Sequence, residues 1–382
     1  MENTKKNNIL IGGKKVGKGS HTCVVIPPIK CKTKKLKGKI SKIIEKNKVK
    51  KYVNSVNNKL KEIDEKQKYT IYFDEVCNVK GKDLIQRPYK DFRESDNIKL
   101  ELKNSFEDIE ELNEGKCIVE SDKTYLNFIE TYGGPTLYNL ILTNKKVNNV
   151  SKIILQLLNA VRLLHSNGIV HRDLKLDNVV INPKNGNARL IDFNISRITD
   201  ELQNKPIDEL ITLVGNFKYN ISLDYIILFY IHILITFKNY TFGKKLITVI
   251  IKLCRKKYKN YISSLSDISI SYNSLFSTII SSKDELDEDF IYDEKNNLFD
   301  RNISKIVKMM YKLYKKPNFR DYYLNTYLYK NDIYGLGIMI KILATKYNLR
   351  NKRFLELSNN MISFNPNKRP GIDKCIEFLN KK

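Results

Sequence analysis

The chain of 382 residues contains no tryptophan and only four histidines, and its six cysteines include no Cys-x-x-Cys pair. Because zinc sites need cysteines and histidines at close spacing, the sequence predicts no zinc site. We interpret the cysteines as free thiols in a reducing compartment, which indicates a cytoplasmic protein. They are Cys23, Cys31, Cys77, Cys117, Cys254 and Cys375.

A long hydrophobic run is also missing. No apolar segment opens the chain, so we expect no secretory signal. The most hydrophobic stretch, residues 225–236, is too short to cross a bilayer and contains His232. We therefore predict a buried helix there and no transmembrane segment.

Acidic residues are scarce, because 42 Asp and Glu face 68 Lys and Arg and leave a net charge of +26. This charge suits an acidic partner such as nucleic acid, an anionic membrane or an acidic protein. The alternative is a biased composition, because the lysines are dispersed along the chain and not gathered in one tail. Hydrophobic residues make up 42% of the sequence, enough for a globular protein with two lobes.

Side chains that could take part in catalysis are concentrated in residues 169–178. A helix is predicted before them at 150–166, and strands after them at 179–181 and 188–191. The loop between the helix and the strands carries Asp173, Lys175 and Asn178. Asp192 follows the second strand, so we expect it close to that loop.

These four side chains suit phosphoryl transfer. Asp173 can accept the proton of an attacking hydroxyl, and Lys175 can neutralise the moving phosphoryl group. Asn178 and Asp192 offer the hard oxygen ligands that Mg²⁺ requires. The sequence therefore predicts Asp173, Lys175 and Asn178 as catalytic residues, and Asn178 and Asp192 as metal ligands.

Residues 171–178, His-Arg-Asp-Leu-Lys-Leu-Asp-Asn, match the signature His-Arg-Asp-Leu-x-x-x-Asn, and here the chain resembles the protein kinase superfamily. The lysine two places after the aspartate is typical of its serine/threonine kinases. The resemblance implies an α+β, two-lobed protein kinase-like fold, with a β-rich N-lobe at 1–132 and a mainly helical C-lobe at 133–382. It also implies ATP and Mg²⁺ as cofactors and Asp173 as the catalytic base.

A glycine pair near the N-terminus resembles the kinase glycine-rich loop, Gly-x-Gly-x-x-Gly-x-Val, whose backbone approaches the phosphates. The expected nucleotide contacts are Gly17, Lys18, Gly19, Ser20 and Val24. Thr22 stands where the family has its third glycine.

The apolar run around Lys42 resembles the kinase strand whose lysine holds the α- and β-phosphates. Lys39 is the competing candidate, and we favour Lys42 because apolar neighbours on both sides bury its stem. A helix predicted at 45–66 offers Glu62, which either pairs Lys42, as in the family, or faces solvent.

The link between the lobes is expected just before the predicted helix at 137–142. Strands are predicted at 69–73, 116–120 and 125–129. The segment Glu130-Thr-Tyr132-Gly-Gly-Pro then resembles the kinase hinge. We expect backbone groups of Glu130 and Tyr132 to bind adenine.

Two family motifs are altered in the second half of the chain. Asn194 replaces the glycine of Asp-Phe-Gly, and asparagine tolerates the positive φ that such a turn can need. Ala-Pro-Glu is absent, and we predict that Asp224 pairs Arg369 in its place. Asp332 is expected to accept backbone N–H groups of the catalytic loop, to cap its own helix, or to do both.

Hydroxyl groups after the Asp-Phe-Asn motif are candidate phosphorylation sites facing Arg172, and they are Ser196, Thr199 and Thr212. Residues 237–325 exceed what the family needs, so we interpret them as a large insertion into the C-lobe. Helices are predicted within the insertion at 246–253 and 303–314.

The sequence thus predicts a serine/threonine protein kinase that transfers the γ-phosphoryl group of ATP to protein substrates. Its composition and altered motifs resemble the divergent kinases of large DNA viruses, which would place it in a host cell or a virion. Three rival interpretations remain open: a pseudokinase scaffold that binds partners through the insertion, a small-molecule or lipid phosphotransferase, and a nucleic-acid-binding protein.

Overall fold

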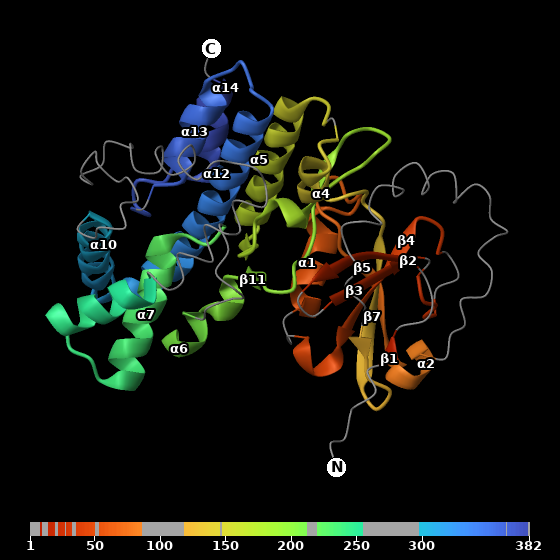
Figure 1. Cartoon of the computed structure of the whole chain (residues 1–382), viewed down its shortest axis with the longest axis horizontal. Coiled ribbons are helices and arrows are strands. Elements are labelled where there is room, and N and C mark those ends of the chain that lie inside the picture. The colour runs from red at the N-terminus through yellow and green to blue at the C-terminus, as the bar shows by residue number, and fades with distance from the viewer. Residues whose placement is uncertain are drawn as a thin grey trace. The chain divides into compact units, whose positions relative to one another are not determined.

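The computed structural model describes the chain except for residues 1–7, 10–13, 20–21, 27, 33–35, 50–52, 86–117, 146, 212–219, 255–297, 364 and 381–382. The chain divides into two compact units, Met1–Pro135 and Thr136–Lys382. The first is built on a sheet, and the second is mainly helical (Figure 1). This is the α+β fold class that the sequence predicts.

An antiparallel five-stranded sheet forms the N-terminal unit, in the order β2-β3-β4-β7-β5. Its strands are β2 (Lys14–Gly19), β3 (Thr22–Ile26), β4 (Lys39–Glu45), β5 (Phe73–Lys80) and β7 (Thr124–Thr131). Short strands β1 (Asn8–Ile9) and β6 (Ile118–Val119) pair separately. The helical elements are η1 (Lys46–Lys48), α1 (Val53–Ile63) and α2 (Gly81–Ile85).

Alternation along β4 sends side chains to two separate cores, one on each face of the sheet. Ile44 packs with Phe128 and with Val53 of α1, so α1 covers this face. Ile43 belongs to the other cluster, with Val25, Ile29, Val79, Leu84, Val119 and Tyr125. Lys42 lies two residues before Ile44 and therefore points to the α1 side.

Two element boundaries differ from those that the sequence predicted. The Asp64 carboxylate accepts the backbone N–H groups of Lys68, Tyr69 and Thr70 at 2.7–2.9 Å, so the strand predicted at 69–73 begins only at Phe73. The helix predicted at 45–66 begins at Val53. Residues up to Glu45 belong to β4, which pairs with β7, and the short helix η1 follows at Lys46–Lys48.

The prediction of free thiols is wrong for the N-terminal unit. Cys31 and Cys77 form a disulfide with a Cα–Cα distance of 5.8 Å, which joins the segment after β3 to β5. Cys23 is also disulfide-bonded. Cys254 and Cys375 are free and buried, and Cys117 lies outside the described residues. Cysteine usage therefore gives no support for a reducing compartment.

The C-terminal unit begins with two helices that match their predicted bounds, α4 (Leu137–Leu142) and α5 (Val150–Ser166). Short elements follow: β8 (Ile169–Val170), η2 (Leu176–Asn178), β9 (Val179–Ile181), β10 (Ala188–Leu190), β11 (Arg197–Ile198), η3 (Asp200–Leu202) and α6 (Ile207–Leu210). β9 and β10 form an antiparallel hairpin, and β11 pairs with β8.

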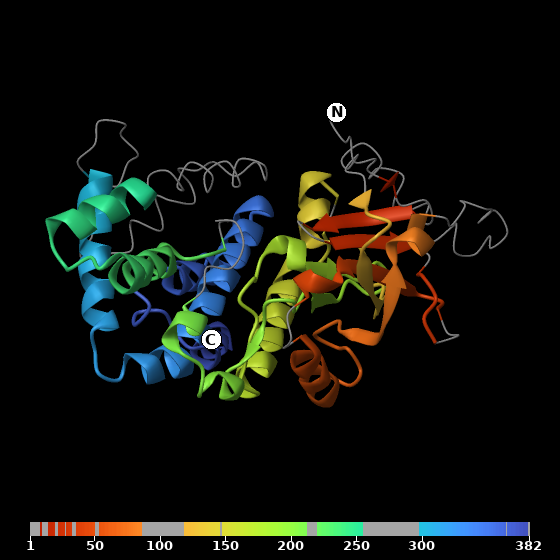
Figure 2. The same cartoon turned by 90° about the horizontal axis from the view of Figure 1, so that it is seen from below.

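Longer helices complete this unit (Figures 1 and 2). They are α7 (Leu223–Lys238), a helix over 244–254, α10 (Leu298–Tyr314), α11 (Phe319–Tyr322), the π-helical turn η4 (Tyr323–Tyr327), α12 (Leu328–Lys346), α13 (Arg353–Met361) and α14 (Ile372–Asn380). The stretch predicted as a buried helix lies in α7, and both helices predicted in the insertion form. Among the described residues, no helix combines the length and apolar character needed to span a membrane.

One lysine lies in the core of this unit. Lys341 of α12 is 2% exposed, and its amine donates to Asn359 Oδ1 at 3.1 Å. Burial lowers the pKa of Lys341 to about 7, from an ordinary value of 10.5. The folded chain therefore releases this proton while the unfolded chain still holds it.

Replacing Lys341 with methionine should stabilise the fold in a pH-dependent way. Between pH 7 and about 10 the unfolded state binds the extra proton, so the wild type gains stability as the pH rises. We expect Lys341→Met to be more stable by about 2–4 kcal/mol at pH 7, and this advantage should shrink toward pH 10. Urea denaturation at pH 7, 8, 9 and 10 measures it, with exposed Lys352→Met as the control. A stability difference that does not change with pH would contradict the buried neutral amine.

Candidate active site

The predicted catalytic loop lies between β8 and β9, and the hairpin after it brings the two predicted metal ligands together. Val179 pairs with Leu190 across the hairpin, and the N–H of Ile191 donates to the carbonyl of Asn178 at 3.0 Å. Asn178 and Asp192 therefore leave the same end of the β9–β10 hairpin. This placement follows from the short apolar strands and the Asn-Pro-Lys-Asn-Gly turn that joins them.

Three side chains converge on the carboxylate of Asp173. Its Oδ2 atom accepts from the Lys175 amine and, at 2.9 Å, from Asn178 Nδ2. Asn178 Nδ2 also donates to the Asp173 carbonyl at 2.8 Å. On the other oxygen, Oδ1, the amide of Asn220 donates at 2.9 Å. Charge-assisted and amide hydrogen bonds thus fix the orientation of the carboxylate.

The amide of Asn178 is oriented for a cation. Because its Nδ2 atom is used twice by Asp173, its Oδ1 atom is directed away and accepts no hydrogen bond from any described residue. Asp192 supplies a carboxylate from the adjacent end of the hairpin. Amide and carboxylate oxygens fit Mg²⁺, so these two side chains are suited to hold it.

Asp332 of α12 holds the backbone of the catalytic loop by hydrogen bonds. Its carboxylate accepts the N–H groups of His171 and Arg172, each at 2.7 Å, and lies 3.2 Å from His165 Nε2. Arg172 has a φ of 69°, which is strained for a residue with a side chain, and the hydrogen bond to Asp332 keeps it there. The predicted contact with the loop is confirmed. Asp332 is no helix cap, because α12 already begins at Leu328.

A glycine lets α12 approach the loop this closely. A Cβ atom on Gly335 would lie 2.8 Å from the carbonyl oxygen of Leu174 and 3.3 Å from that of Asn220. Both neighbours are backbone atoms that cannot turn away. Gly335 therefore allows direct packing of the helix against the residue that follows Asp173.

His171 links the loop to the strand end that carries Asp192. Its ring Nδ1 accepts the N–H of Asp173 at 3.3 Å, and its Nε2 lies 3.1 Å from the carbonyl of Ile191. The ring also packs on Phe193, with centroids 4.8 Å apart. A fully buried imidazole thus connects the two segments that hold the predicted catalytic and metal-binding groups.

The turn after Asp192 differs from the sequence expectation. The positive φ falls on Asp192, at 67°, and Asn194 is not in the left-handed region. A hydrogen bond of 3.1 Å from Ser196 N–H to the Phe193 carbonyl closes the turn. Asparagine therefore replaces glycine here without backbone strain.

Two of the three candidate phosphorylation sites are buried. Ser196 is 0% exposed and donates to the carbonyl of His171 at 3.1 Å. Thr199 is 3% exposed, and its hydroxyl donates to the carbonyl of Gly168 at 3.2 Å. Both hydroxyls hold the catalytic segment together, so the prediction is wrong for them. Thr212 lies outside the described residues.

Asp224 and Arg369 form the predicted ion pair, and both side chains are 0% exposed. The second oxygen of Asp224 accepts the Tyr327 hydroxyl at 2.8 Å. Arg369 also donates to the carbonyls of Ser363 at 2.7 Å and Lys330 at 3.3 Å. The pair therefore joins α7 to the segment before α14 with its hydrogen bonds satisfied.

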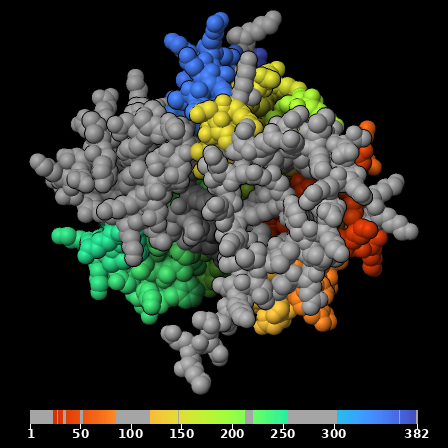
Figure 3. Space-filling model, turned by 45° about the vertical axis from the view of Figure 1, so that its right-hand side comes forward, coloured from red at the N-terminus to blue at the C-terminus, as the bar shows by residue number. Residues whose placement is uncertain are grey.

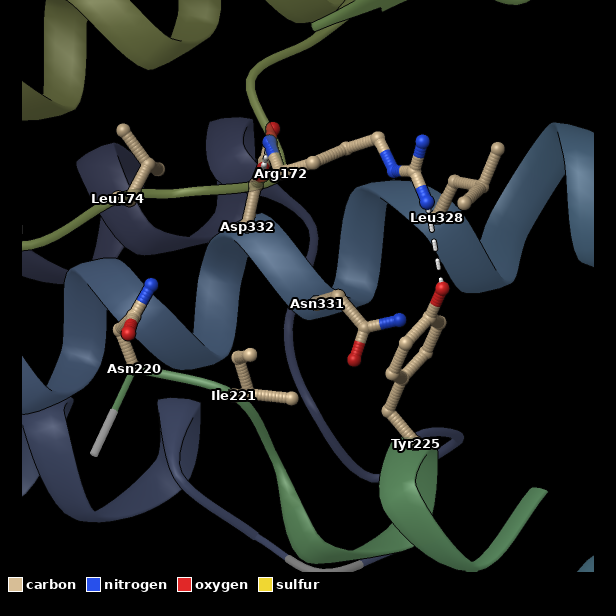
Figure 4. A pocket seen from close by; sticks show the side chains of 8 residues that line it. All are labelled: Arg172, Leu174, Asn220, Ile221, Tyr225, Leu328, Asn331 and Asp332. Carbon is tan, nitrogen blue, oxygen red and sulfur yellow. Dashed lines mark hydrogen bonds between the residues drawn. The ribbon is translucent and has the colours of Figure 1, made fainter. Parts of the chain in front are cut away.

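Asn220 is a neighbour of Asp173 that no sequence motif indicated. It is 6% exposed, and its Oδ1 atom has no hydrogen-bond partner among the described residues. Figure 4 shows it beside a small pocket under the catalytic loop, where the Arg172 guanidinium donates to the Tyr225 hydroxyl at 3.3 Å. The pocket is lined by Arg172, Leu174, Asn220, Ile221, Tyr225, Leu328, Asn331 and Asp332.

The N-terminal unit aligns three predicted nucleotide contacts in one row across its sheet. Gly17 pairs with Val24, and Val24 pairs with Lys42. Lys42 is 8% exposed on the face that α1 covers. Its competitor Lys39 is paired with Asp74 at 2.7 Å, and the choice between the two lysines stays a prediction.

The remaining predicted contacts in this unit lie on β2 and near the end of β7. Lys18 and Gly19 belong to β2, Glu130 belongs to β7, and Ser20 lies outside the described residues. The backbone N–H of Tyr132 donates to the Gly38 carbonyl at 2.9 Å, so that group already has a partner. Burial raises the pKa of the Tyr132 phenol well above its usual value.

Glu62 does not provide the family's partner for Lys42. Its carboxylate is 66% exposed and pairs with Lys59 at 3.3 Å, one turn earlier in α1. Asn57 occupies the buried side of the helix instead. Its amide bonds both the N–H and the carbonyl of Phe73 at 3.0 Å, which fastens α1 to β5. The solvent-facing alternative for Glu62 is therefore correct.

Part of the chain is similar to a known protein family. The protein kinase domain family matches residues 89–220, which include the catalytic loop and Asp192. A probable serine/threonine-protein kinase KIN1 homolog of Encephalitozoon cuniculi is 36% identical over 87 residues, covering 22% of this chain and 15% of that protein. CBL-interacting protein kinase 31 of Oryza sativa is 36% identical over 77 residues, covering 20% and 17%. Protein kinase gsk3 of Schizosaccharomyces pombe is 34% identical over 84 residues, covering 20% and 22%.

These matches support the protein kinase superfamily. The chain spans less than a quarter of the length of each of these relatives, and the matched stretch leaves out the expected glycine-rich loop and Lys42. None of the three is a viral protein, so the likeness to viral kinases stays a prediction.

Breaking the Asp224–Arg369 pair should destabilise the C-terminal unit, because each single change leaves an unpaired buried charge. We expect Asp224→Asn and Arg369→Met each to cost about 3–5 kcal/mol, and the double variant to cost less than their sum. Urea denaturation measures the three values, with exposed Asp373→Asn as a control that should change little. Additive losses would contradict a direct pair.

Removing the Asn220 amide should leave the Oδ1 atom of Asp173 without the hydrogen bond that orients the carboxylate. We expect Asn220→Ala to lower the kcat of phosphoryl transfer by about 10- to 100-fold with KM for ATP unchanged, since a misplaced reacting group loses rate and not binding. Asn220→Ser, which can still donate a hydrogen bond, should recover part of the loss. Exposed Asn325→Ala is the control, and equal kcat values for the wild type and Asn220→Ala would contradict the role.

Proposed function

We propose that the protein is a serine/threonine protein kinase that transfers the γ-phosphoryl group of ATP to protein hydroxyls. The observation that carries the proposal is the Asp173 carboxylate, held by Lys175, Asn178 and Asn220 within a loop that matches the kinase signature. Such an arrangement suits positioning and electrostatic catalysis, which dominate phosphoryl transfer.

Each residue has a role in this proposal. Asp173 receives the hydroxyl of the protein substrate and accepts its proton, and the Lys175 ammonium lies beside it to offset the charge on the phosphoryl group. Asn178 and Asp192 hold Mg²⁺ by their oxygen atoms. Bound Mg²⁺-ATP supplies the phosphoryl group and neutralises its charge.

In the N-terminal unit the proposal assigns the phosphates to Lys42 and to the β2–β3 hairpin that contains Gly17, Gly19 and Val24. Adenine is assigned to the backbone near Glu130 and Tyr132. The antiparallel sheet of this unit supports the phosphate assignment, and the family match over residues 89–220 supports only the assignment to Glu130 and Tyr132.

A pseudokinase scaffold is the second candidate, and one observation favours it. Glu62, the only glutamate in α1, pairs with Lys59 and not with Lys42. Kinases use that glutamate to hold the phosphate-binding lysine in place. A scaffold would bind partners through the insertion and would transfer no phosphate.

Mg²⁺-dependent transfer of labelled γ-phosphate to mixed protein substrates tests the proposal. We expect phosphoserine or phosphothreonine as the product, with kcat lower by about 10³-fold in Asp173→Asn because the proton acceptor is lost. Asp192→Asn should lose activity with a rise in the Mg²⁺ concentration needed, because one oxygen ligand becomes neutral.

Asp373→Asn is the matched control, because its exposed carboxylate lies in the same unit on α14. It should retain wild-type activity. A folded wild type that transfers no phosphate to any substrate or to itself would favour the scaffold. Transfer to lipids or small molecules alone would support the corresponding rival.

A further inference from the structure

The insertion presents a basic surface that contains aromatic rings. We call it the lysine–aromatic surface, and its residues are Phe237, Lys238, Tyr240, Phe242, Lys245, Lys308, Tyr311, Lys312 and Lys315. Phe242 stacks on Tyr311 with ring centroids 4.1 Å apart, which joins the turn after α7 to α10. Within the C-terminal unit, α7 and α10 lie at the end away from α4 in both views (Figures 1 and 2).

Basic residues outnumber acidic ones in the elements that form this surface, where α7 contains Asp224, which is paired with Arg369, and α10 contains Asp300. The described stretches 225–254 and 303–320 contain no aspartate or glutamate. Their basic residues are Lys238, Lys244, Lys245, Lys252, Lys305, Lys308, Lys312, Lys315, Lys316 and Arg320. Asp208 of α6 lies 3.1 Å from the ring of His232, and Asp321 directly follows Arg320. Figure 3 shows the residues of α7 and 244–254, green to teal, at the molecular surface.

These lysines are not needed to pack the helices. The helices α10 and 244–254 pack through other residues, since Leu246, Ile250, Ile303, Val307 and Met310 are each 0% exposed, and Ile247, Val249, Ile251 and Leu253 are partly exposed. Lys308 and Lys312 share one face of α10 at a spacing of four residues, where like charges repel and destabilise a helix, and Lys315 directly follows the last residue of α10, Tyr314. A partner of opposite charge would relieve that repulsion.

The surface has features that favour a protein partner over nucleic acid. A base-binding surface needs free ring faces, but Phe242 and Tyr311 already stack on each other, and the amines of Lys315 and Lys245 lie over Tyr311 and Tyr240 at 5.9 and 5.4 Å. The cations that define this surface are lysines, which act as point charges, and Arg320 beside it already donates to the carbonyls of Leu202 and Gln203.

An anionic membrane also fits less well. An interfacial helix buries a continuous apolar face in the bilayer, but the helices here pack apolar residues inside the protein. Among the large hydrophobic side chains that the structure describes in this region, Phe237 and Phe242 are strongly exposed, at 55% and 41%. Two rings among lysines suit a short segment with one or two apolar side chains among carboxylates.

We infer that the lysine–aromatic surface binds an acidic segment of the protein substrate, with an apolar side chain of that segment against Phe237 and Phe242. This inference rests on the proposed kinase function and specifies its substrate class. Binding at a second place on the same chain would raise the effective concentration of the target hydroxyl at Asp173. The surface would therefore select substrates without touching the reacting atoms.

Binding can be tested without phosphoryl transfer. The probe is a fluorescent peptide rich in Glu and Asp, with one Leu and no Ser or Thr, and fluorescence anisotropy measures its affinity for the full chain. We expect Lys308→Glu/Lys312→Glu/Lys315→Glu to weaken binding by about tenfold or more at low salt, and added salt to weaken wild-type binding. Phe242→Ala should weaken binding with little change in the salt dependence.

The matched control reverses the same amount of charge elsewhere in the same unit, in Arg350→Glu/Lys352→Glu/Lys374→Glu. Affinity lost equally in both triple variants would overturn the docking surface, because net charge alone would explain it. Tighter binding of single-stranded DNA of equal charge, or of vesicles containing anionic lipid, would overturn the assignment to a protein.

Kinetics then separate this inference from the proposed function. Two peptide substrates share one serine sequence, and only one carries the acidic tail. We expect the Lys308/Lys312/Lys315 triple variant to raise KM about tenfold for the tailed peptide and to leave kcat and the untailed peptide unchanged. Tail binding without transfer to either peptide would refute the kinase and keep the surface. Transfer with no advantage for the tailed peptide would refute the surface and keep the kinase.

Discussion

The carboxylate of Asp332 is the contact on which the catalytic loop depends. It accepts two backbone N–H groups from His171 and Arg172, and it keeps Arg172 in a left-handed conformation that would otherwise be costly. Because Asp173 follows directly, its position is set by a helix that lies more than 150 residues later in the chain. Gly335 completes the arrangement, since any side chain there would push α12 away from Leu174.

Buried polar groups continue this pattern through the C-terminal unit. The Asp224–Arg369 pair, with Tyr327, ties α7 to the segment before α14, and His171 ties the loop to Phe193. Such groups cost desolvation and give little net stability, but they allow one arrangement only. The proposed phosphoryl transfer would need such fixed positions more than it needs stability.

Each unit has a feature that differs from what the resemblance to kinases predicted. In the N-terminal unit Asn57, and not a glutamate, fastens α1 to the sheet, and a Cys31–Cys77 disulfide holds β5 to the segment after β3. In the C-terminal unit the insertion adds helices that bury apolar side chains. The first features join α1 and the segment after β3 to β5, and the second leaves the described lysines of the insertion at the surface.

Local patterns and family likeness were enough to predict α5, the β9–β10 hairpin and the loop with Asp173, because helical spacing, turns and motif residues are local in sequence. The pairing of Asp224 with Arg369 and the role of Asp332 came from the resemblance to kinases, since no local rule reaches across more than 140 residues. Only the tertiary structure decided that Asn220 contacts Asp173, that Glu62 pairs with Lys59, that the left-handed residue is Asp192, and that Cys31 bonds Cys77. Each depends on which backbone segments lie side by side, and a sequence pattern does not determine that.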